Sequence, residues 1–253
     1  MGAGAAAHAR PGASDRGADA WRAGGVAQLC AQARKIAGGG GVKAAPRADR
    51  AEIEEVAKAL NVSRETFSAW TAYIAVLEAW APVHNLIGPA EWREFGQRHL
   101  LDCAQLPFLA PAARRWVDLG SGAGLPGLVI AAMLIGIEGA EVTLVERDQK
   151  KAVFLRAAIR AMGVPATVMA IDATQLPEID CDVVTARALA PMADLLRLSQ
   201  PLIRKGAIGL FPKGKEVERE LTALPGFAHY HFIRHSSRSD SAGVVVEARS
   251  VLR

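Results

Sequence analysis

Four glycines and one aspartate stand close together in the stretch VDLGSGAGLPG, residues 117–127. Gly120, Gly122 and Gly124 follow Asp118 at alternate positions. Glycine adopts left-handed backbone torsions and lets a ligand approach the main chain closely, whereas in a plain turn so many glycines would cost conformational entropy. The stretch therefore predicts a loop that binds a ligand.

Two classes of ligand fit this loop. Gly122, Gly124 and Gly127 satisfy the dinucleotide pattern G-x-G-x-x-G, which is typical of NAD(P)-dependent enzymes. The pattern D-x-G-x-G-x-G, beginning at Asp118, is instead that of S-adenosylmethionine (SAM) methyltransferases. A carboxylate beside the ligand would repel a pyrophosphate, but it suits the ammonium and sulfonium charges of SAM. The aspartate therefore favours SAM.

Two further acids are expected around the same pocket. Glu146 ends the next predicted strand, where its carboxylate can accept hydrogen bonds from both ribose hydroxyls of either ligand. Asp172 follows the third predicted strand, where an adenine amine could donate to it. Together with Asp118, these acids favour a cationic cofactor, and therefore SAM over a nicotinamide dinucleotide.

The methyl acceptor is expected near DVVTARALAP, residues 182–191, at the end of the fourth predicted strand. The segment lacks the Asn/Asp-Pro-Pro-aromatic turn that holds an exocyclic base amine. Cys181 stands at the beginning of this strand, at the end away from the proline, so it is a poor candidate for a nucleophile. An acceptor that needs no activation remains, such as N7 of guanine. For that atom, in-line positioning would supply most of the catalysis.

Six segments, in this order, resemble the bacterial family RsmG, also called GidB: HNLI, RHLLDC, VDLGSGAGLPG, LVERDQKKAVFL, VVTARALAP and FPKGK. The family methylates guanine N7 in 16S ribosomal RNA. The resemblance covers roughly residues 50–253. It implies a helical extension before a methyltransferase domain, SAM as cofactor, and a guanine of the decoding region of the small ribosomal subunit as target.

The resemblance also implies which residues hold the cofactor. By matching motif, Gly120 and Leu125 line the cofactor loop. Ala173 and Thr174 correspond to an Ala-Glu pair that contacts the adenosine. Thr174 stands where the family has the glutamate of that pair, and it is still expected to line the cofactor site.

Three residues are candidate catalytic groups. Arg187 follows a buried strand and is expected at the mouth of the site, on a carboxylate, a phosphate or guanine O6; pairing with Asp182 or Asp194 is the alternative. Lys213 ends the fifth predicted strand, where it would contact a phosphate or be simply solvated. Asn85 matches the upstream family segment Tyr-Asn-Leu-Thr, or it stabilises a buried turn.

Two polar groups of residues have both a structural and a functional interpretation. His99 and Asp102 share a helix face, where they would tie the helical part to the sheet or act in the site. A basic run following the second predicted strand is either a solvated helix face or a patch for the RNA backbone; it comprises Arg147, Lys150, Lys151, Arg156 and Arg160.

Strands and helices alternate after residue 110. The predicted strands are 115–119, 141–146, 166–170, 181–186 and 207–213, with helices at 126–136, 149–162 and 191–200. A hairpin of 229–236 and 243–251 is expected at the sheet edge. This order predicts an α/β fold, a doubly wound, Rossmann-like SAM-dependent methyltransferase sheet that binds ligands at the carboxyl ends of its strands.

The chain divides into three parts by composition. Residues 1–48 are rich in Ala, Gly and Arg and predict a disordered basic tail. Residues 49–110 predict a helical subdomain: helices lie between 49 and 80, with Trp70 and Trp80 in the core, and a third covers 91–106. Residues 111–253 form the predicted methyltransferase domain.

The net charge of +4 comes from the tail. Residues 1–48 hold seven basic and two acidic side chains, which leaves 23 basic against 24 acidic in the remainder. A polyanion would therefore need a local patch or the tail. Cys30, Cys103 and Cys181 are too far apart for a zinc motif or a disulfide framework. We expect a cytoplasmic monomer without metal or membrane contact, whose partner is 16S ribosomal RNA or the small subunit.

Two other classes of function stay open. An NAD(P)-dependent oxidoreductase would use GAGLPG as its fingerprint, but it would need a proton-relay pair such as Tyr and Lys at helical spacing, and neither Tyr73 nor Tyr230 has such a setting. A non-catalytic ribosome-assembly factor would bind RNA and transfer no methyl group. The intact loop, Glu146 and Arg187 argue against that loss of activity.

Overall fold

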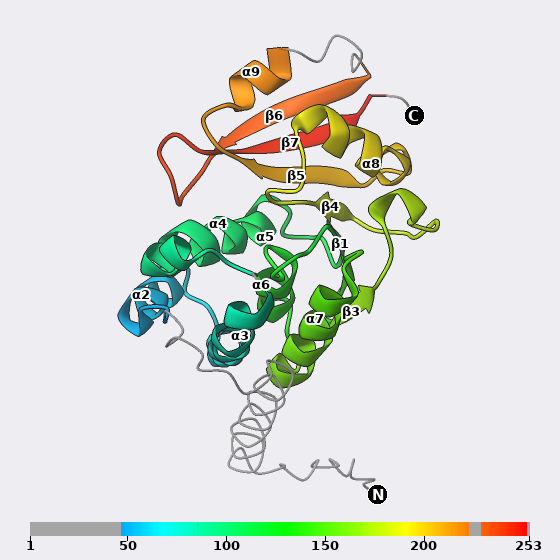
Figure 1. Cartoon of the computed structure of the whole chain (residues 1–253). Helices are drawn as coiled ribbons and strands as arrows, with labels where there is room; N and C mark the ends of the chain where they lie inside the picture. Colours follow the sequence, from blue (N-terminus) through cyan, green and yellow to red (C-terminus); the bar gives the residue numbers. More distant parts are fainter. Residues whose placement is uncertain (1–46, 85, 223–228, 252–253) are drawn as a thin grey trace, which may run out of the picture.

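The computed structural model describes residues 47–84, 86–222 and 229–251. Over these residues, seven strands form one sheet in the order β3-β2-β1-β4-β5-β7-β6 (Figure 1). The parallel strands are β1 (Arg115–Leu119), β2 (Glu141–Val145), β3 (Ala166–Met169), β4 (Val183–Thr185) and β5 (Ile208–Lys213). The hairpin of β6 (Tyr230–Ser236) and β7 (Val244–Ser250) adds to β5 through β7, antiparallel.

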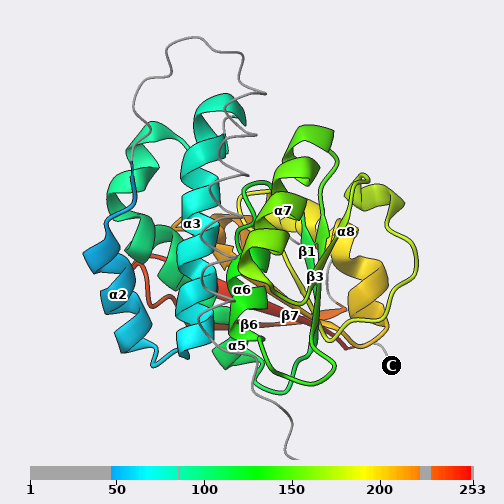
Figure 2. The same ribbon diagram turned by 90° about the horizontal axis from the view of Figure 1, so that it is seen from below.

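Helices cover both faces of the sheet, which explains why its central strands are apolar on both sides. One face packs against α3 (Arg64–His84), α6 (Gly127–Met133) and α7 (Gln149–Met162). The other face packs against α8 (Met192–Arg204) and α9 (Val217–Thr222). Figure 2 shows α3, α6 and α7 on one side of β1 and β3, with α8 on the other. The predicted α/β architecture is therefore confirmed.

The N-terminal helices share the core of the sheet. The side chains of α2 (Arg50–Ala59) and α3 join the same buried cluster as α6 and α7. Trp70 is fully buried, and Trp80 packs against Phe154 of α7 with ring centroids 5.9 Å apart, which confirms both as core residues. One hydrophobic core therefore extends across the predicted boundary at residue 111. The three-part domain organisation stays a prediction.

The predicted helical stretch over 91–106 is present, but it is not one regular α-helix. A 3₁₀ helix η1 (Pro89–Glu94) leads into a π-helix η2 (Phe95–Leu101), followed by α4 (Asp102–Ala104) and α5 (Leu106–Leu109). The carboxylate of Glu52 in α2 accepts the N–H groups of Gly96 and Gln97, each at 2.9 Å. Because those two N–H groups bond to another helix, the regular helical pattern is interrupted there.

The remaining predicted elements differ from the observed ones mainly at their ends. All seven predicted strands are present within two residues of their expected bounds, and α7 begins and ends where expected. Helix α8 continues past Pro201 to Arg204, four residues beyond its predicted end. The sequence reasoning missed α9 and the short 3₁₀ helix η3 (Ala173–Gln175).

The predicted tail, with Cys30, lies outside the described residues except for its last two positions. There, Ala48 donates its N–H to the Glu78 carboxylate at 3.0 Å. Of the helices in the part of the chain that is described, none has the length and apolar character needed to span a membrane.

Candidate active site

The glycine loop connects β1 to α6 at the carboxyl edge of the sheet. Gly120, Gly122 and Gly124 all have positive φ, at +66°, +54° and +89°. A Cβ on Gly120 would lie 2.4 Å from Leu189 Cδ1, so the exposed Leu189 side chain would have to move to admit one. A Cβ on Gly122 would meet nothing closer than the Gly120 carbonyl oxygen at 3.7 Å, and Gly122 lines a cavity. The bare backbone at Gly122 is therefore open to a ligand.

The structure corrects the expected place of Asp118, which lies beneath the loop and does not line the cavity. Its Oδ2 accepts the N–H of Gly127, the first residue of α6, at 3.1 Å. A Cβ on Gly127 would lie only 2.7 Å from that oxygen. Asp118 therefore fixes the loop to the helix, and any effect on a ligand passes through the loop.

Asp118 makes a pH-dependent contribution to stability. Burial raises its pKa from 3.8 to about 7, although the hydrogen bond from Gly127 opposes the shift. The folded state therefore binds a proton that the unfolded chain releases, so this contribution is lost as pH rises from about 4 to about 7. In thermal unfolding, the midpoint of the wild type should fall relative to that of Asp118→Asn across this window. Parallel midpoints would contradict the shift.

Glu146 forms the wall of the cavity beside Gly122. Its Oε2 accepts the Gly122 N–H and its Oε1 accepts the Asp148 N–H, both at 2.8 Å. The side chain is almost fully buried but still lines the cavity. Because each carboxylate oxygen has two acceptor positions, both can accept a further hydrogen bond. The predicted contact with ribose hydroxyls therefore fits this geometry.

Asp172, Ala173 and Thr174 line the same part of the cavity. Asp172 Oδ1 accepts the N–H of Thr174 at 2.9 Å and its hydroxyl at 2.8 Å, and Oδ2 pairs with Arg147 at 3.4 Å. Hydrogen bonding from Thr174, with a smaller effect of Arg147, lowers the pKa of Asp172. The carboxylate is therefore charged and already orders its own turn, while its contact with an adenine amine stays a prediction.

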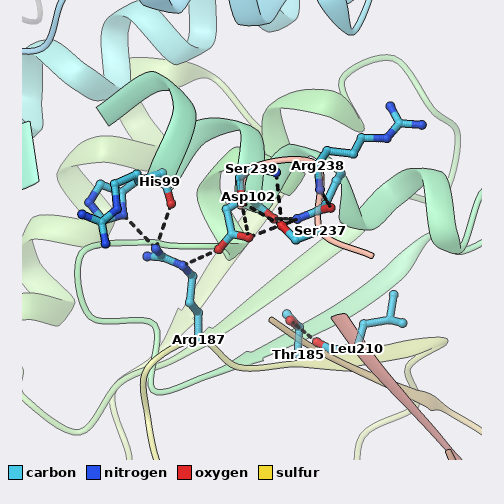
Figure 3. Close-up of polar contacts among 10 residues, drawn as sticks. His99, Asp102, Thr185, Arg187, Leu210, Ser237, Arg238 and Ser239 are labelled. Carbon is cyan, nitrogen blue, oxygen red and sulfur yellow. Dashed lines mark hydrogen bonds and ion pairs between the residues drawn. The ribbon is translucent and has the colours of Figure 1, made fainter. Parts of the chain in front are cut away.

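Arg187 pairs with neither Asp182 nor Asp194, the two partners that its alternative interpretation proposed. Asp182 binds Arg115, and Asp194 binds Arg197. Arg187 instead donates from Nε to Asp102 Oδ2 at 2.9 Å (Figure 3).

Two further groups of the π-helix hold the same guanidinium. Arg187 Nη2 donates to the Arg98 carbonyl at 3.0 Å and contacts His99 Nδ1 at 2.9 Å. His99 and Asp102 thus tie the helical part to the end of β4, as their structural interpretation predicted, and both also line the cavity.

The other two candidate catalytic groups have different outcomes. Lys213 lines the cavity, but its Nζ donates to Glu220 Oε2 at 2.7 Å and to the Ala190 carbonyl at 3.1 Å. Its side chain is only 12% exposed, so the prediction that Lys213 is simply solvated is wrong. A phosphate that bound the Lys213 ammonium would have to share it with Glu220. Asn85 lies outside the described residues.

One cavity of about 980 Å³ joins the two groups of residues. This is at the upper end of the range of about 300–1,000 Å³ that is usual for ligand pockets. Its cofactor half contains Gly122, Glu146, Asp172 and Thr174, and its acceptor half contains His99, Asp102, Arg187 and Ser239. Two carboxylates and an exposed glycine backbone fit a cationic, ribose-bearing cofactor such as SAM.

Helix α3 supports the loop in a way that the sequence did not reveal. Thr66, Trp70 and Tyr73 lie on one face of α3 and donate hydrogen bonds to three main-chain carbonyls, those of Ala132, Val129 and Ala123. The Tyr73 bond to Ala123 is 2.7 Å long and reaches the loop between two of its glycines. The spacing of apolar residues in α3 predicts core packing but gives no sign that these three side chains also donate hydrogen bonds.

Tyr73→Phe should weaken the cofactor loop. The change leaves the Ala123 carbonyl without its donor, so we expect a loss of about 1 kcal/mol of unfolding free energy. A few-fold weaker binding of S-adenosylhomocysteine should accompany it. Calorimetry and thermal unfolding measure the two effects. In Tyr230→Phe, which loses a longer contact of 3.5 Å to Leu196, ligand affinity should stay unchanged; equal losses in both variants would contradict the role of Tyr73.

Comparisons with known proteins agree on one family. The family model described as rRNA small subunit methyltransferase G, GidB, matches residues 67–241. A ribosomal RNA small subunit methyltransferase G of Methylorubrum populi is 45% identical over 195 residues, covering 76% of this chain and 92% of the relative. One from Rhodopseudomonas palustris (strain HaA2) is 40% identical over 214 residues, with 83% and 90% covered.

Solved structures share the fold at low sequence identity. A mutant of MtNAS in complex with S-adenosylmethionine has a TM-score of 0.51 and 15% identity, covering 90% of this chain and 97% of that one. Cofactor-bound Rv0187 from MTB has a TM-score of 0.51 and 18% identity, with 73% and 90% covered. The predicted Rossmann-like fold is therefore confirmed.

Proposed function

Because the chain belongs to the rRNA small subunit methyltransferase G family, we propose that it transfers the methyl group of SAM to N7 of a guanine in the decoding region of 16S ribosomal RNA. The observation that carries this proposal is the single cavity with two chemically different halves. Glu146 and the Gly122 backbone face one half, and Arg187 faces the other. A cofactor and an acceptor base would therefore meet inside one site.

In this reaction the side chains of the protein bind the cofactor and the base and orient them toward each other. SAM supplies an electrophilic methyl group on a sulfonium centre. Glu146 and Asp172 place negative charge around the cofactor half, which favours a cationic ligand. Guanine N7 has an available lone pair at neutral pH, so no side chain needs to remove a proton. Holding the base in line with the methyl group is then the main contribution of the acceptor half.

Arg187 suits the recognition of guanine O6. A guanidinium donates through fixed N–H groups and accepts nothing, so it can bind the O6 acceptor. Donation to N7 itself would block the nucleophile, so Arg187 must approach O6 alone. Burial, together with the nearby Arg187, lowers the pKa of His99 from 6.5 to about 4, so His99 stays neutral at physiological pH. It therefore adds no charge that would repel the cationic methylated base.

The dinucleotide alternative fits the fold less well. In the nucleotide-binding sheet of dehydrogenases the strand order is 3-2-1-4-5-6. Here the antiparallel strand β7 lies between β5 and β6. Glu146 already binds the N–H of Gly122, so a carboxylate stands where a pyrophosphate would need backbone donors.

The RNA surface is proposed to include the basic run on and before α7. Arg147 and Lys151 line the cavity, while Lys150, Arg156 and Arg160 are exposed. These side chains place positive charge beside the site, in a body whose total charge is nearly zero. Binding to phosphates should then weaken steeply with salt. We also propose that the protein acts as a monomer in the cytoplasm, where the small subunit is assembled.

The first experiment is calorimetric titration with S-adenosylhomocysteine, NAD and NADP in parallel. Micromolar binding of S-adenosylhomocysteine alone supports the cofactor, and binding of a nicotinamide cofactor would overturn it. Transfer of labelled methyl groups to unmodified small subunits and to naked 16S RNA follows, with chemical cleavage at 7-methylguanine to identify the atom. Cofactor binding and RNA binding without methyl transfer would favour the assembly-factor alternative.

A further inference from the structure

The guanidinium of Arg187 is held on one side and open on the other. Arginine has five N–H donors: one on Nε and two on each Nη. Nε binds Asp102, and Nη2 binds the Arg98 carbonyl and His99 Nδ1. Within the described ranges, Nη1 makes no hydrogen bond, although Arg187 lines the cavity. Its two N–H groups are therefore the ones left for a ligand.

Asp102 is the residue on which this arrangement depends. Its Oδ2 binds Arg187, and its Oδ1 accepts the Ser239 hydroxyl at 2.9 Å and the Gln105 amide at 3.0 Å. The side chain is 15% exposed, and the Arg187 side chain is 21% exposed, so water screens the pair only in part. A single carboxylate thus connects the loop after β4 with the loop between β6 and β7.

The loop between β6 and β7 forms a wall of the acceptor half. Ser237, Ser239, Asp240 and Gly243 line the cavity. Gln105, next to the Asp102 helix, accepts the Arg238 N–H at 2.9 Å and so fixes the same loop a second time. Figure 3 shows Asp102 between Arg187 and the loop residues Ser237 and Ser239. The loop and the arginine are therefore placed by one shared anchor.

We propose that Asp102 is a positioning residue for methyl transfer, which holds Arg187 Nη1 toward O6 of the target guanine and fixes residues 237–243 as the wall of the base subsite. This inference rests on the proposed function. Nε and Nη2 are both used by the anchor, so the guanidinium cannot rotate without breaking it. An asparagine amide at position 102 can be placed in two ways. Either its NH₂ faces the Nε donor of Arg187, or its oxygen faces Arg187 and its NH₂ faces the NH₂ of Gln105, which is also a donor.

The test compares Asp102→Asn with a matched control. Asp194→Asn breaks an exposed pair with Arg197 instead. Steady-state methylation of small subunits should show a fall in kcat of up to about 100-fold for Asp102→Asn, since misplacement by about 1 Å can cost that much. The Kd for S-adenosylhomocysteine should stay unchanged. Asp194→Asn should match the wild type in both, and an undiminished kcat in Asp102→Asn would overturn the inference.

A double-mutant cycle separates positioning from general support of the structure. If Asp102 acts through both Arg187 and the loop, then adding Asp102→Asn to Arg187→Ala should lower kcat only by the several-fold loss that comes from the loop contact with Ser239. Multiplicative losses would overturn the inference. If Asp102→Asn lowers the midpoint of thermal unfolding, its loss of kcat could come from a less stable fold. Ser239→Ala then serves as the test, because it removes a single contact with Asp102 and should lower kcat several-fold. An unchanged kcat in Ser239→Ala would refute the role of the loop. An inactive wild type that binds S-adenosylhomocysteine would refute the proposed function, and the inference with it.

Discussion

Gly120→Asp is expected to abolish binding of S-adenosylhomocysteine. Gly120 has φ +66° and faces Leu189, whose Cδ1 would lie 2.4 Å from a new Cβ. Aspartate tolerates left-handed torsions better than most residues, so the loss is expected mainly from a bulkier, charged side chain that displaces Leu189 at the cavity. The added carboxylate would also need hydration at the edge of the cavity. Calorimetry should show no heat of binding at ligand concentrations that saturate the wild type.

The matched control is Gly163→Asp. Gly163 ends α7 with the same φ of +66°, but a Cβ there would meet nothing within 4 Å. This variant carries the same backbone strain without the collision, and it should bind the ligand as the wild type does. If Gly120→Asp retains wild-type affinity, the loop does not hold the cofactor, and its assignment falls.

The sheet was predictable because its signals are local. Valine-rich strands, the glycine loop after β1 and the alternation with helices can each be recognised within a short window of sequence. The segments that resemble the family pointed to a common site, and one cavity is indeed lined by Glu146, Ala173, Thr174 and Arg187. Residues that end neighbouring parallel strands converge at one edge, so knowing the strand order was sufficient.

The place of Asp118 could have been found from its strand. Side chains alternate along a strand, so Asp118 shares a face with Trp116, whose cluster includes the helix that follows the loop. An aspartate on that face points under α6, toward Gly127, and away from the ligand. The motif identified the residue correctly, but the alternation of side chains decides where it points.

The acceptor half could not be predicted because its contacts are remote in sequence. Arg187 and Asp102 are 85 residues apart, and Asp102 and Ser239 are 137 apart. The π-helix that places His99 depends on Glu52, some 45 residues upstream. The contact with α2 changes the type of helix within 91–106, and no short window of sequence contains both partners.

Glu146→Ala should weaken S-adenosylhomocysteine binding by about 100-fold or more. The change removes the proposed acceptor of the ribose hydroxyls. It also leaves the Gly122 and Asp148 N–H groups without their partner. Each unsatisfied group costs about 1–3 kcal/mol where water cannot replace the carboxylate. Calorimetry should show the loss of affinity, together with a lower midpoint of thermal unfolding. Glu141→Ala, at the exposed start of the same strand, should change neither quantity.

Glu146→Gln tests whether the position needs two accepting oxygens or only a side chain of this size. The two oxygens of Glu146 accept from two different backbone donors, so an amide can satisfy one and must turn its NH₂ toward the other. Glutamine should therefore be nearly as harmful to affinity as alanine, although its volume is conserved. If Glu146→Gln binds S-adenosylhomocysteine as the wild type does, the paired acceptance is not needed, and the ribose must bind elsewhere in the cavity. A loss in both variants would show that the loop and the ribose site depend on the same two oxygens.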